Sequence, residues 1–286
     1  MSTSMTKGNP LKLMLQFAFP LLIGNLLQQT YNIIDAAIVG QILGAKALAS
    51  VGASSSIQFL VLGFCMGSCT GFGVPIAKYF GAGKLDQMRN YVFNGALLTA
   101  GIAVILTALC SVFCPQILHM LSVPEDIYDN AYAYLLIIFL GIPFTLLYNY
   151  LSSILRSLGD SRTPFLFLAF SAILNIFLDL FCIVVLKWGC AGAAAATITA
   201  QAISGILCLV FIGRKMNVLH LTKENRMVNI TAVKELLAMG LPTGLQFSIT
   251  AIGSMVMQSA NNGLGSVCVS GFTAGMRIKQ FAMCPF

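Results

Sequence analysis

The chain has 286 residues, of which 58% are hydrophobic and 9% are charged, and its mean hydropathy is +0.88. Soluble domains carry about 25% charged residues, so this composition excludes an ordinary soluble domain and predicts a membrane protein. The formal net charge of +7 comes from Lys and Arg that cluster between apolar runs. This clustering favours a role in membrane topology over the binding of nucleic acid.

Charged residues divide the sequence into apolar runs, most of them longer than the roughly 20 residues that a helix needs to cross the hydrocarbon core. In chain order the runs cover residues 13–43 with Asp35 inside, 46–78, 89–125, 129–156, 162–187 with Asp179 inside, 187–214, and 236 onward. They predict seven spanning helices and the beginning of an eighth. We therefore expect an all-α membrane protein, a polytopic helical bundle.

The distribution of Lys and Arg predicts the orientation of these helices. With a cytoplasmic N-terminus, the inner side receives twelve basic residues between Lys7 and Lys234, and the outer side receives only Lys46 and Lys187. Inner loops of membrane proteins carry such an excess. The first apolar run is too long for a cleavable signal peptide and lacks a small-residue cleavage site. We expect a multi-pass protein of the cell membrane with a cytoplasmic N-terminus.

An internal repeat predicts two domains. Lys12 and Pro20 recur at the same spacing as Lys234 and Pro242, which is typical of parallel repeats in transporters. Residues 1–220 are expected to form a six-helix N-terminal lobe, and residues 221–286 the start of a second lobe, with helix 7 and a partial helix 8. On this interpretation about four helices of a second repeat are missing, and the chain is a truncated product.

Truncation has consequences for stability and activity. Polar residues of helices 7 and 8, namely Gln246, Thr250 and Asn261, would lack partners inside the membrane, which is costly. The isolated chain is therefore expected to insert without exporting substrate. Protease is expected to cut first in the polar stretch of residues 214–226.

Polar residues follow one face of two predicted helices. Asn25, Gln28, Asn32 and Asp35 are spaced by 3, 4 and 3 residues in helix 1, so they share a helical face. This polar stripe is a candidate lining for a substrate cavity. Because a carboxylate at mid-membrane costs about 2.5–3.5 kcal/mol, Asp35 must face protein or water.

A second stripe lies in helix 5, where Ser171, Asn175 and Asp179 follow at steps of four. Asp35, Asp179 and Thr197 of helix 6 each stand seven or eight residues from the outer end of their helix. At about 1.5 Å per residue, all three lie roughly 10–12 Å below the outer surface. Equal depth indicates one shared site, although each acid could instead anchor helix packing through hydrogen bonds.

Motifs of several enzyme classes are absent from the sequence. It contains no G-x-x-x-x-G-K-[ST] phosphate loop, no H-E-x-x-H and no G-x-S-x-G, which carry the chemistry of several enzyme classes. We expect neither an enzyme nor a cofactor. Transport without an ATP site would have to use an ion gradient.

Several stretches in this order and spacing resemble the multidrug and toxic compound extrusion (MATE) family, within a superfamily that includes flippases for lipid-linked precursors. The stretches are Pro20, Asp35 and Gly40 in helix 1, Leu43–Ala49, Tyr79–Gly83, Leu155–Pro164, Asn175 with Asp179, and Gly192–Thr197. The resemblance covers nearly the whole chain, and only about the first two thirds of a MATE protein.

The resemblance implies a V-shaped pair of six-helix lobes, monomeric at full length, that exports small organic compounds in exchange for H⁺ or Na⁺. It also implies a cation site at the positions matching Asp35, Asn175, Asp179 and Thr197, and a bend of helix 1 near Pro20 when that site is occupied. Two alternatives stay open: a flippase for a lipid-linked saccharide, and a fragment that transports nothing. The first six helices hold no basic residue inside their spans, which favours neutral or cationic substrates, whereas Arg277 and Lys279 in helix 8 favour the flippase.

The pair of acids predicts a coupling mechanism. Two carboxylates that face each other away from water disfavour two full charges. One of them could therefore take up a proton reversibly, or the pair could hold Na⁺ with oxygens of Asn175 and Thr197. Either event could change the preferred arrangement of helix 1, which is sufficient for coupling.

Overall fold

The computed structural model describes residues 9–121, 123, 125–222 and 225–262. Within these residues every regular element is helical, so the prediction of an all-α fold is confirmed. The elements are α1 (Pro10–Ile42), α2 (Ala45–Gly81), α3 (Leu85–Val112), α4 (Cys114–Met120), α5 (Glu125–Leu140), α6 (Ile142–Ser157), α7 (Arg162–Leu180), η1 (Phe181–Val185), α8 (Gly189–Lys215), η2 (Asn217–Leu219) and α9 (Ile230–Asn262).

The predicted spans correspond to these helices. Among the described residues, six helices are individually long and apolar enough to cross a membrane, and α5 with α6 makes a seventh span that is bent by 46°. Six of the seven predicted spans are therefore matched by single helices, and the fourth is matched when the bent pair is counted as one span. The predicted helix 8 lies outside the described residues.

The bend between α5 and α6 has a local cause. Pro143, in the first turn of α6, has no N–H to continue the hydrogen bonding of α5. A side chain at Gly141 would overlap Ile198 of α8. The fourth span is thus broken where α8 crosses it most closely.

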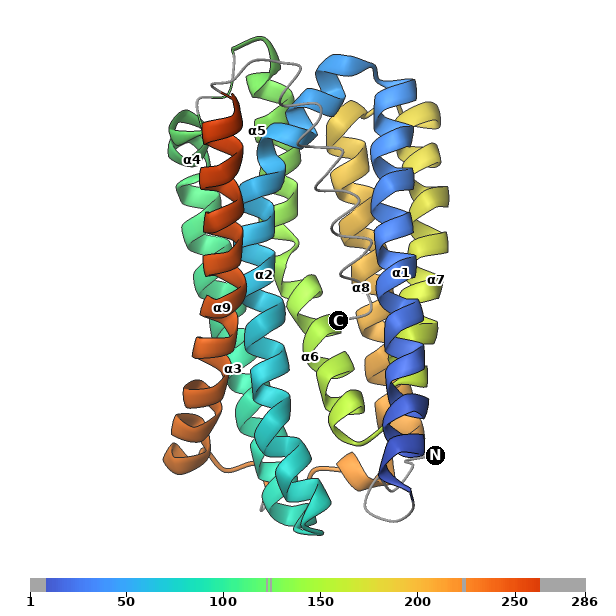
Figure 1. The fold of residues 1–286 in the computed structure, drawn as a ribbon, viewed down its shortest axis with the longest axis vertical. Helices are drawn as coiled ribbons and strands as arrows, with labels where there is room; N and C mark the ends of the chain where they lie inside the picture. Colours follow the sequence, from blue (N-terminus) through green and yellow to red (C-terminus); the bar gives the residue numbers. More distant parts are fainter. Residues whose placement is uncertain (1–8, 122, 124, 223–224, 263–286) are drawn as a thin grey trace.

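The helices run side by side along the long axis of the molecule (Figure 1). In that view α1, α7 and α8 lie on one side, and α2, α3 and α9 lie on the other, with α5 and α6 between them. The contacts agree, since α8 packs against α5, α6 and α7, and α2 packs against α5, α6 and α9. Large side chains such as Phe72, Met88 and Phe139 are fully buried between the helices.

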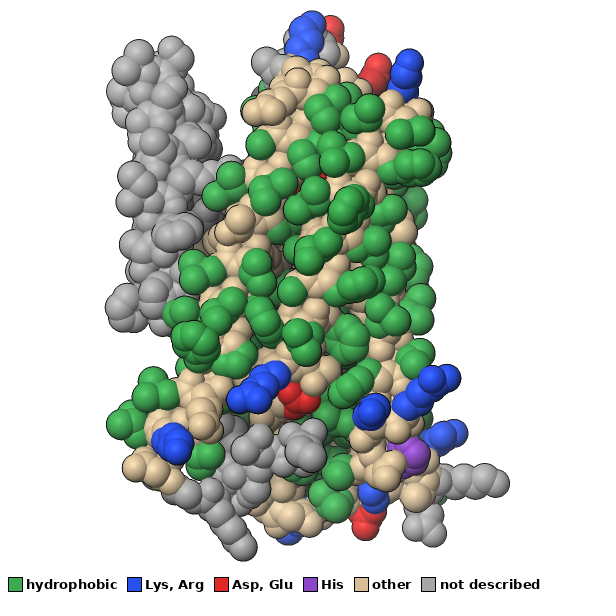
Figure 2. Space-filling view, turned by 90° about the vertical axis from the view of Figure 1, so that its right-hand side faces the viewer, with side chains coloured by type: hydrophobic (Ala, Val, Ile, Leu, Met, Phe, Trp, Pro, Cys, Tyr) green, Lys and Arg blue, Asp and Glu red, His purple; other side chains and the backbone are tan. Residues whose placement is uncertain are grey.

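Charge and apolar surface are separated along the same axis. The start of α1, the end of α2 and the start of α9 lie at one end of the bundle (Figure 1), called the basic end here because Lys12, Lys78, Lys84, Arg89 and Lys234 belong to it. Figure 2 shows hydrophobic side chains over most of the face formed by α1 and α7, with Lys and Arg mainly toward the basic end. An apolar surface of this extent is suited to lipid, and the protein is a polytopic membrane protein.

Glycines set the packing of α9 on α2. A Cβ atom at Gly71 of α2 would lie 2.5 Å from the Met239 carbonyl oxygen and 2.6 Å from the Gly240 Cα. Gly67 faces Gly244 in the same way, with 2.8 Å from its ideal Cβ to the Gly244 Cα. Small residues four apart on both helices allow such close backbone contact in membranes.

This packing bears on the expectation that helix 7 lacks partners, because α9 contacts other helices. The boundary predicted after residue 220 marks the sequence repeat, but α9 packs against α2 and α3 of the first six spans. Gln246 and Thr250 are on the exposed side, where the Thr250 hydroxyl donates to the Gln246 carbonyl at 3.0 Å. The side chain of Asn261 lies outside the described residues.

Asparagines of α3 hold the segment that leads into α9. The Asn90 amide nitrogen donates to the carbonyl oxygens of Asn225 (3.2 Å) and Met227 (2.9 Å). The fully buried Asn94 donates to the Met227 carbonyl (3.1 Å) and accepts from the Asn229 N–H (3.0 Å). The stretch predicted to be cut first by protease is therefore attached to α3 at its C-terminal end.

Candidate functional site

The polar stripe of α7 is buried. Ser171, Asn175 and Asp179 are 6%, 2% and 0% exposed, as their spacing of four predicts, and α7 packs against α1 and α8. Two residues after Asp179 the chain widens into the π-helical η1. Wide turns of this kind are frequent at functional sites. The buried face of α7 is therefore the wall on which the site is built.

Asp35 of α1 lies next to Asp179 on this buried face of α7. The two carboxyl groups lie close enough to interact directly with one another. The Oδ1 atom of each is buried and has no hydrogen-bond partner among the described residues. Buried carboxylate oxygens without a partner carry a large desolvation cost. A proton shared by the pair, or a cation between them, would remove that cost.

Asn175 and Thr197 complete an oxygen-rich set. The Asn175 amide contacts the Thr197 hydroxyl at 3.3 Å. The nitrogen and oxygen of this amide are assigned from the hydrogen-bond partners around them. The nitrogen then donates to Asp179 Oδ2 at 2.7 Å, and the oxygen accepts from the Thr197 N–H at 3.1 Å. Carboxylate, amide and hydroxyl oxygens are the ligands that hard cations prefer. The residues present therefore fit a small hard cation as well as a proton.

Three further residues surround the pair and were not predicted. The Tyr31 hydroxyl lies 3.4 Å from Thr197 Oγ1. Tyr134 of α5 is buried and lies near Gln58 of α2, close enough to both carboxylates to interact with them electrostatically. Tyr31 stands four residues before Asp35, so its helical face could have indicated it.

A small cavity adjoins the site on the side of Gln28. Its volume is about 20 Å³, and Tyr31, Asn175, Thr197 and Gln201 are among its lining residues. That volume is sufficient for about one water molecule. Besides Asp35 itself, Gln28 is thus a member of the helix 1 stripe that borders the predicted cation site.

The other predicted residues of α1 lie elsewhere. Asn25 and Asn32 are exposed, and the Asn32 amide nitrogen donates to Gln29 Oε1 at 3.3 Å. Pro20 lies inside α1, which continues through it as one helix. Pro20 instead lines a groove of about 570 Å³ that also contains Lys12 and Arg162. The structure thus brings together Asp35, Asn175, Asp179 and Thr197, with Gln28 beside them.

Comparisons with known proteins identify the family to which this sequence is similar. The MatE family model matches residues 20–181, more than half of the chain. The chain is 34% identical to the probable multidrug resistance protein YpnP of Bacillus subtilis (strain 168) over 280 residues, covering 98% of this chain and 62% of that protein. It is 28% identical over 280 residues to the probable multidrug resistance protein NorM of Thermotoga maritima, covering 96% of this chain and 60% of that protein. The chain therefore spans less than two thirds of the length of these relatives.

A solved structure has the same fold. The outward-facing conformation of a multidrug resistance MATE family transporter of the MOP superfamily superimposes with a TM-score of 0.92, covering 99% of this chain and 63% of that chain at 23% identity. The relatives are named as resistance and transport proteins, which confirms the prediction that the chain is not an enzyme. The chain belongs to the MATE family, as its motifs predict.

Proposed function

We propose that this chain supplies the ion-coupling lobe of a secondary active transporter that exports drugs or other organic compounds in exchange for H⁺ or Na⁺. The observation that carries the proposal is the pair Asp35 and Asp179, each with a buried carboxylate oxygen that has no partner among the described residues. Acids in this state inside a membrane protein are by default candidates for ion or proton transfer.

The site is placed to couple ion binding to a movement of α1. Asp35 and Tyr31 belong to α1, whereas Asp179 and Thr197 belong to α7 and α8, so a bound ion would join α1 to its neighbours. Much of the remaining α1 surface is exposed, and Leu11, Leu15 and Phe19 are each more than 60% exposed. A helix held by few contacts can change position when one contact strengthens. Neutralising the pair would shift α1 toward the arrangement that closes the site.

The polar groups near the site favour neutral or cationic substrates. The amides of Asn25, Gln28 and Asn32 carry no charge, and along α1, α7 and α8 the described Lys and Arg are confined to the helix ends. A flippase for lipid-linked saccharides would need basic groups for anionic head groups. We therefore favour export of organic compounds. The basic end faces the cytoplasm in this proposal, in the cell membrane and with a monomer as the working unit.

The test is an efflux assay on the polypeptide that carries this sequence at the full length of its relatives. D35N and D179N should each reduce gradient-driven efflux at least tenfold while the protein still accumulates in the membrane, because a neutral amide cannot exchange a proton or balance a cation. D86N is the matched control, since Asp86 is exposed and bonds Arg89 within α3. Normal efflux by both site variants would return these acids to a packing role.

A further inference from the structure

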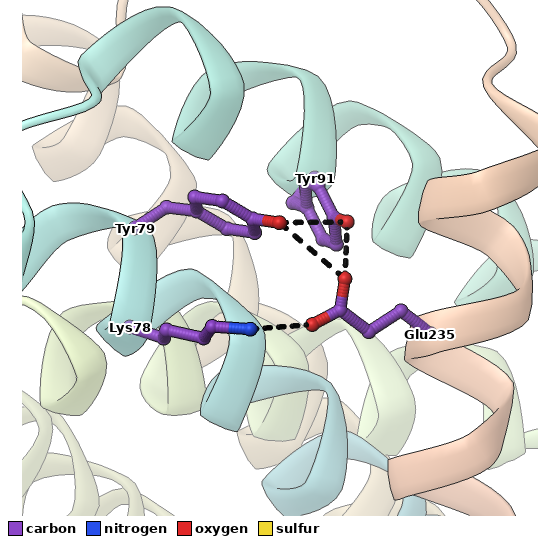
Figure 3. Close-up of polar contacts among 4 residues, drawn as sticks. All are labelled: Lys78, Tyr79, Tyr91 and Glu235. Carbon is purple, nitrogen blue, oxygen red and sulfur yellow. Dashed lines mark hydrogen bonds and ion pairs between the residues drawn. The ribbon is translucent and has the colours of Figure 1, made fainter.

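A second carboxylate cluster joins α9 to the first six spans at the basic end (Figure 3). Glu235 of α9 faces Lys78 and Tyr79 of α2 and Tyr91 of α3. Its Oε1 atom pairs with Lys78 Nζ at 3.2 Å. Its Oε2 atom accepts from the Tyr91 hydroxyl and from the Tyr79 hydroxyl at 3.5 Å. Both oxygens of this carboxylate are therefore engaged by groups of other helices.

The contacts along α9 are of two kinds. In the middle of the helix, the crossing at Gly240 and Gly244 brings backbone against backbone, and no side chain can adjust there. Five residues earlier, Glu235 is held by an ion pair with Lys78 and by tyrosine hydrogen bonds, and its side chain is 27% exposed. Water can replace hydrogen bonds at such a site. The crossing is therefore fixed, while the contact at the basic end can be released.

Both helices carry a proline next to the crossing. Pro242 lies between the two glycines of α9, and Pro75 lies between Gly71 and Lys78 of α2. Each proline removes one backbone hydrogen bond of its helix, and helices bend at such positions. Bending at these prolines would let the basic end of α9 move while the crossing stays packed.

We propose that Glu235 is a releasable latch, a positioning residue that holds the basic end of α9 on α2 and α3. When Glu235 lets go, the basic end of α9 pivots about the glycine crossing. The inference rests on the proposed transport function, because an exporter must open and close its cytoplasmic end. Release requires the carboxylate to exchange Lys78 and two tyrosine hydroxyls for water. The exposed ion pair with Lys78 contributes little by itself, so the tyrosine hydrogen bonds to the charged group supply most of what Glu235 contributes to the contact.

Two buried alanines of α9 allow a test on either side of the pivot. Ala232 lies toward the basic end and is 0% exposed, and Ala251 lies beyond the crossing and is 1% exposed. A cysteine is placed at each position in separate proteins, in membranes, without substrate or ion gradient. N-ethylmaleimide labelling is then followed peptide by peptide by mass spectrometry. The native Cys69 and Cys208, both buried, report global unfolding in the same sample.

In the E235Q background, N-ethylmaleimide should label A232C roughly five- to tenfold faster than in the parent protein, because a charged hydrogen-bond acceptor is lost at a partly exposed site. A251C should stay within about twofold of its rate in the parent protein, since the crossing is untouched. D86N, which changes an acid of the same end that pairs with Arg89 of its own helix, should alter neither rate. Acceleration at both alanines and at Cys208 would show a purely structural role and overturn the proposal.

An unchanged rate at A232C would also overturn it. Where E235Q does not accumulate in the membrane, Y91F gives the same two-site comparison, because it removes one hydroxyl and keeps the ring. Labelling needs no transport, so failure of the ion-site proposal in D35N would leave this result intact. Failure of the latch would equally leave the ion site untouched.

Discussion

Carboxylates meet tyrosines in two regions of this chain, and the two regions differ in what the carboxylates lack. Inside the first lobe, Asp35 and Asp179 lie together, and each has a buried oxygen without a partner among the described residues. At the basic end, both oxygens of Glu235 accept hydrogen bonds or pair with Lys78. The first region has unsatisfied acceptors, and the second has none.

This difference separates a ligand site from an internal contact. Hydrogen-bonded buried polar groups contribute to structure, whereas an unsatisfied one needs another explanation, such as an ion or a catalytic role. Both regions combine carboxylates with tyrosines, so this combination alone does not distinguish them. The number of acceptors left without a donor does.

The largest expected effect comes from overpacking the crossing that holds α9, and with it Glu235, against α2. G71V would place a methyl-bearing side chain where even a Cβ atom lies 2.5 Å from the Met239 carbonyl oxygen. Such overpacking should destabilise the contact of α9 with α2 by about 3 kcal/mol. Denaturation of the protein in detergent should show α9 released first. G101V is the control, because open space surrounds Gly101, and equal loss in both variants would contradict the close crossing.

A smaller effect is expected from the attachment of α9 to α3. N94A removes the buried amide that binds the backbone of Met227 and Asn229, which should cost about 2 kcal/mol because these groups lose their partner. Limited proteolysis should then cut near residues 225–229 several times faster. N149A is the control, since the Asn149 amide donates to the Thr145 carbonyl of its own helix. Unchanged cleavage in N94A would mean that the linker is held by other contacts.

The smallest effect distinguishes Na⁺ from H⁺ at the carboxylate pair. T197V keeps the shape of the side chain and removes the hydroxyl near Asn175. If Na⁺ is the coupling ion, the loss of one oxygen ligand should weaken half-maximal Na⁺ activation of efflux roughly fivefold, equivalent to about 1 kcal/mol. If H⁺ is the coupling ion, T197V should have little effect. T99V is the control, because the Thr99 hydroxyl bonds the Gly95 carbonyl within α3.

Periodicity and depth made much of this structure predictable. Runs without charge identify spans because the membrane excludes charge, and steps of four placed Ser171, Asn175 and Asp179 on one face. Counting residues from helix ends placed Asp35, Asp179 and Thr197 at one level, and the structure brings them together. Their role in ion coupling stays a prediction.

Lateral neighbours were the part that the sequence could not supply. Tyr134 and Gln58 reach the site from α5 and α2, and no local pattern states which spans are adjacent. The four-residue spacing of Gly67 with Gly71, and of Gly240 with Gly244, was a visible signal for helix contact. It would have predicted a partner for α9. Asn25 shares a helical period with Asp35, yet it is exposed because α7 and α8 cover only part of that face of α1.

The most direct test of the ion site is modification by a membrane-soluble carbodiimide, located by mass spectrometry of the chain in lipid vesicles. This reagent attacks carboxyl groups that carry a proton in an apolar place. We predict modification at Asp35 or Asp179, loss of that modification in D35N and D179N respectively, and none at Glu235, whose oxygens are engaged. Protection by added Na⁺ would identify Na⁺ as a competing ligand. Modification of Glu235 with no reaction at either aspartate would contradict the assignment of the ion site to the buried pair.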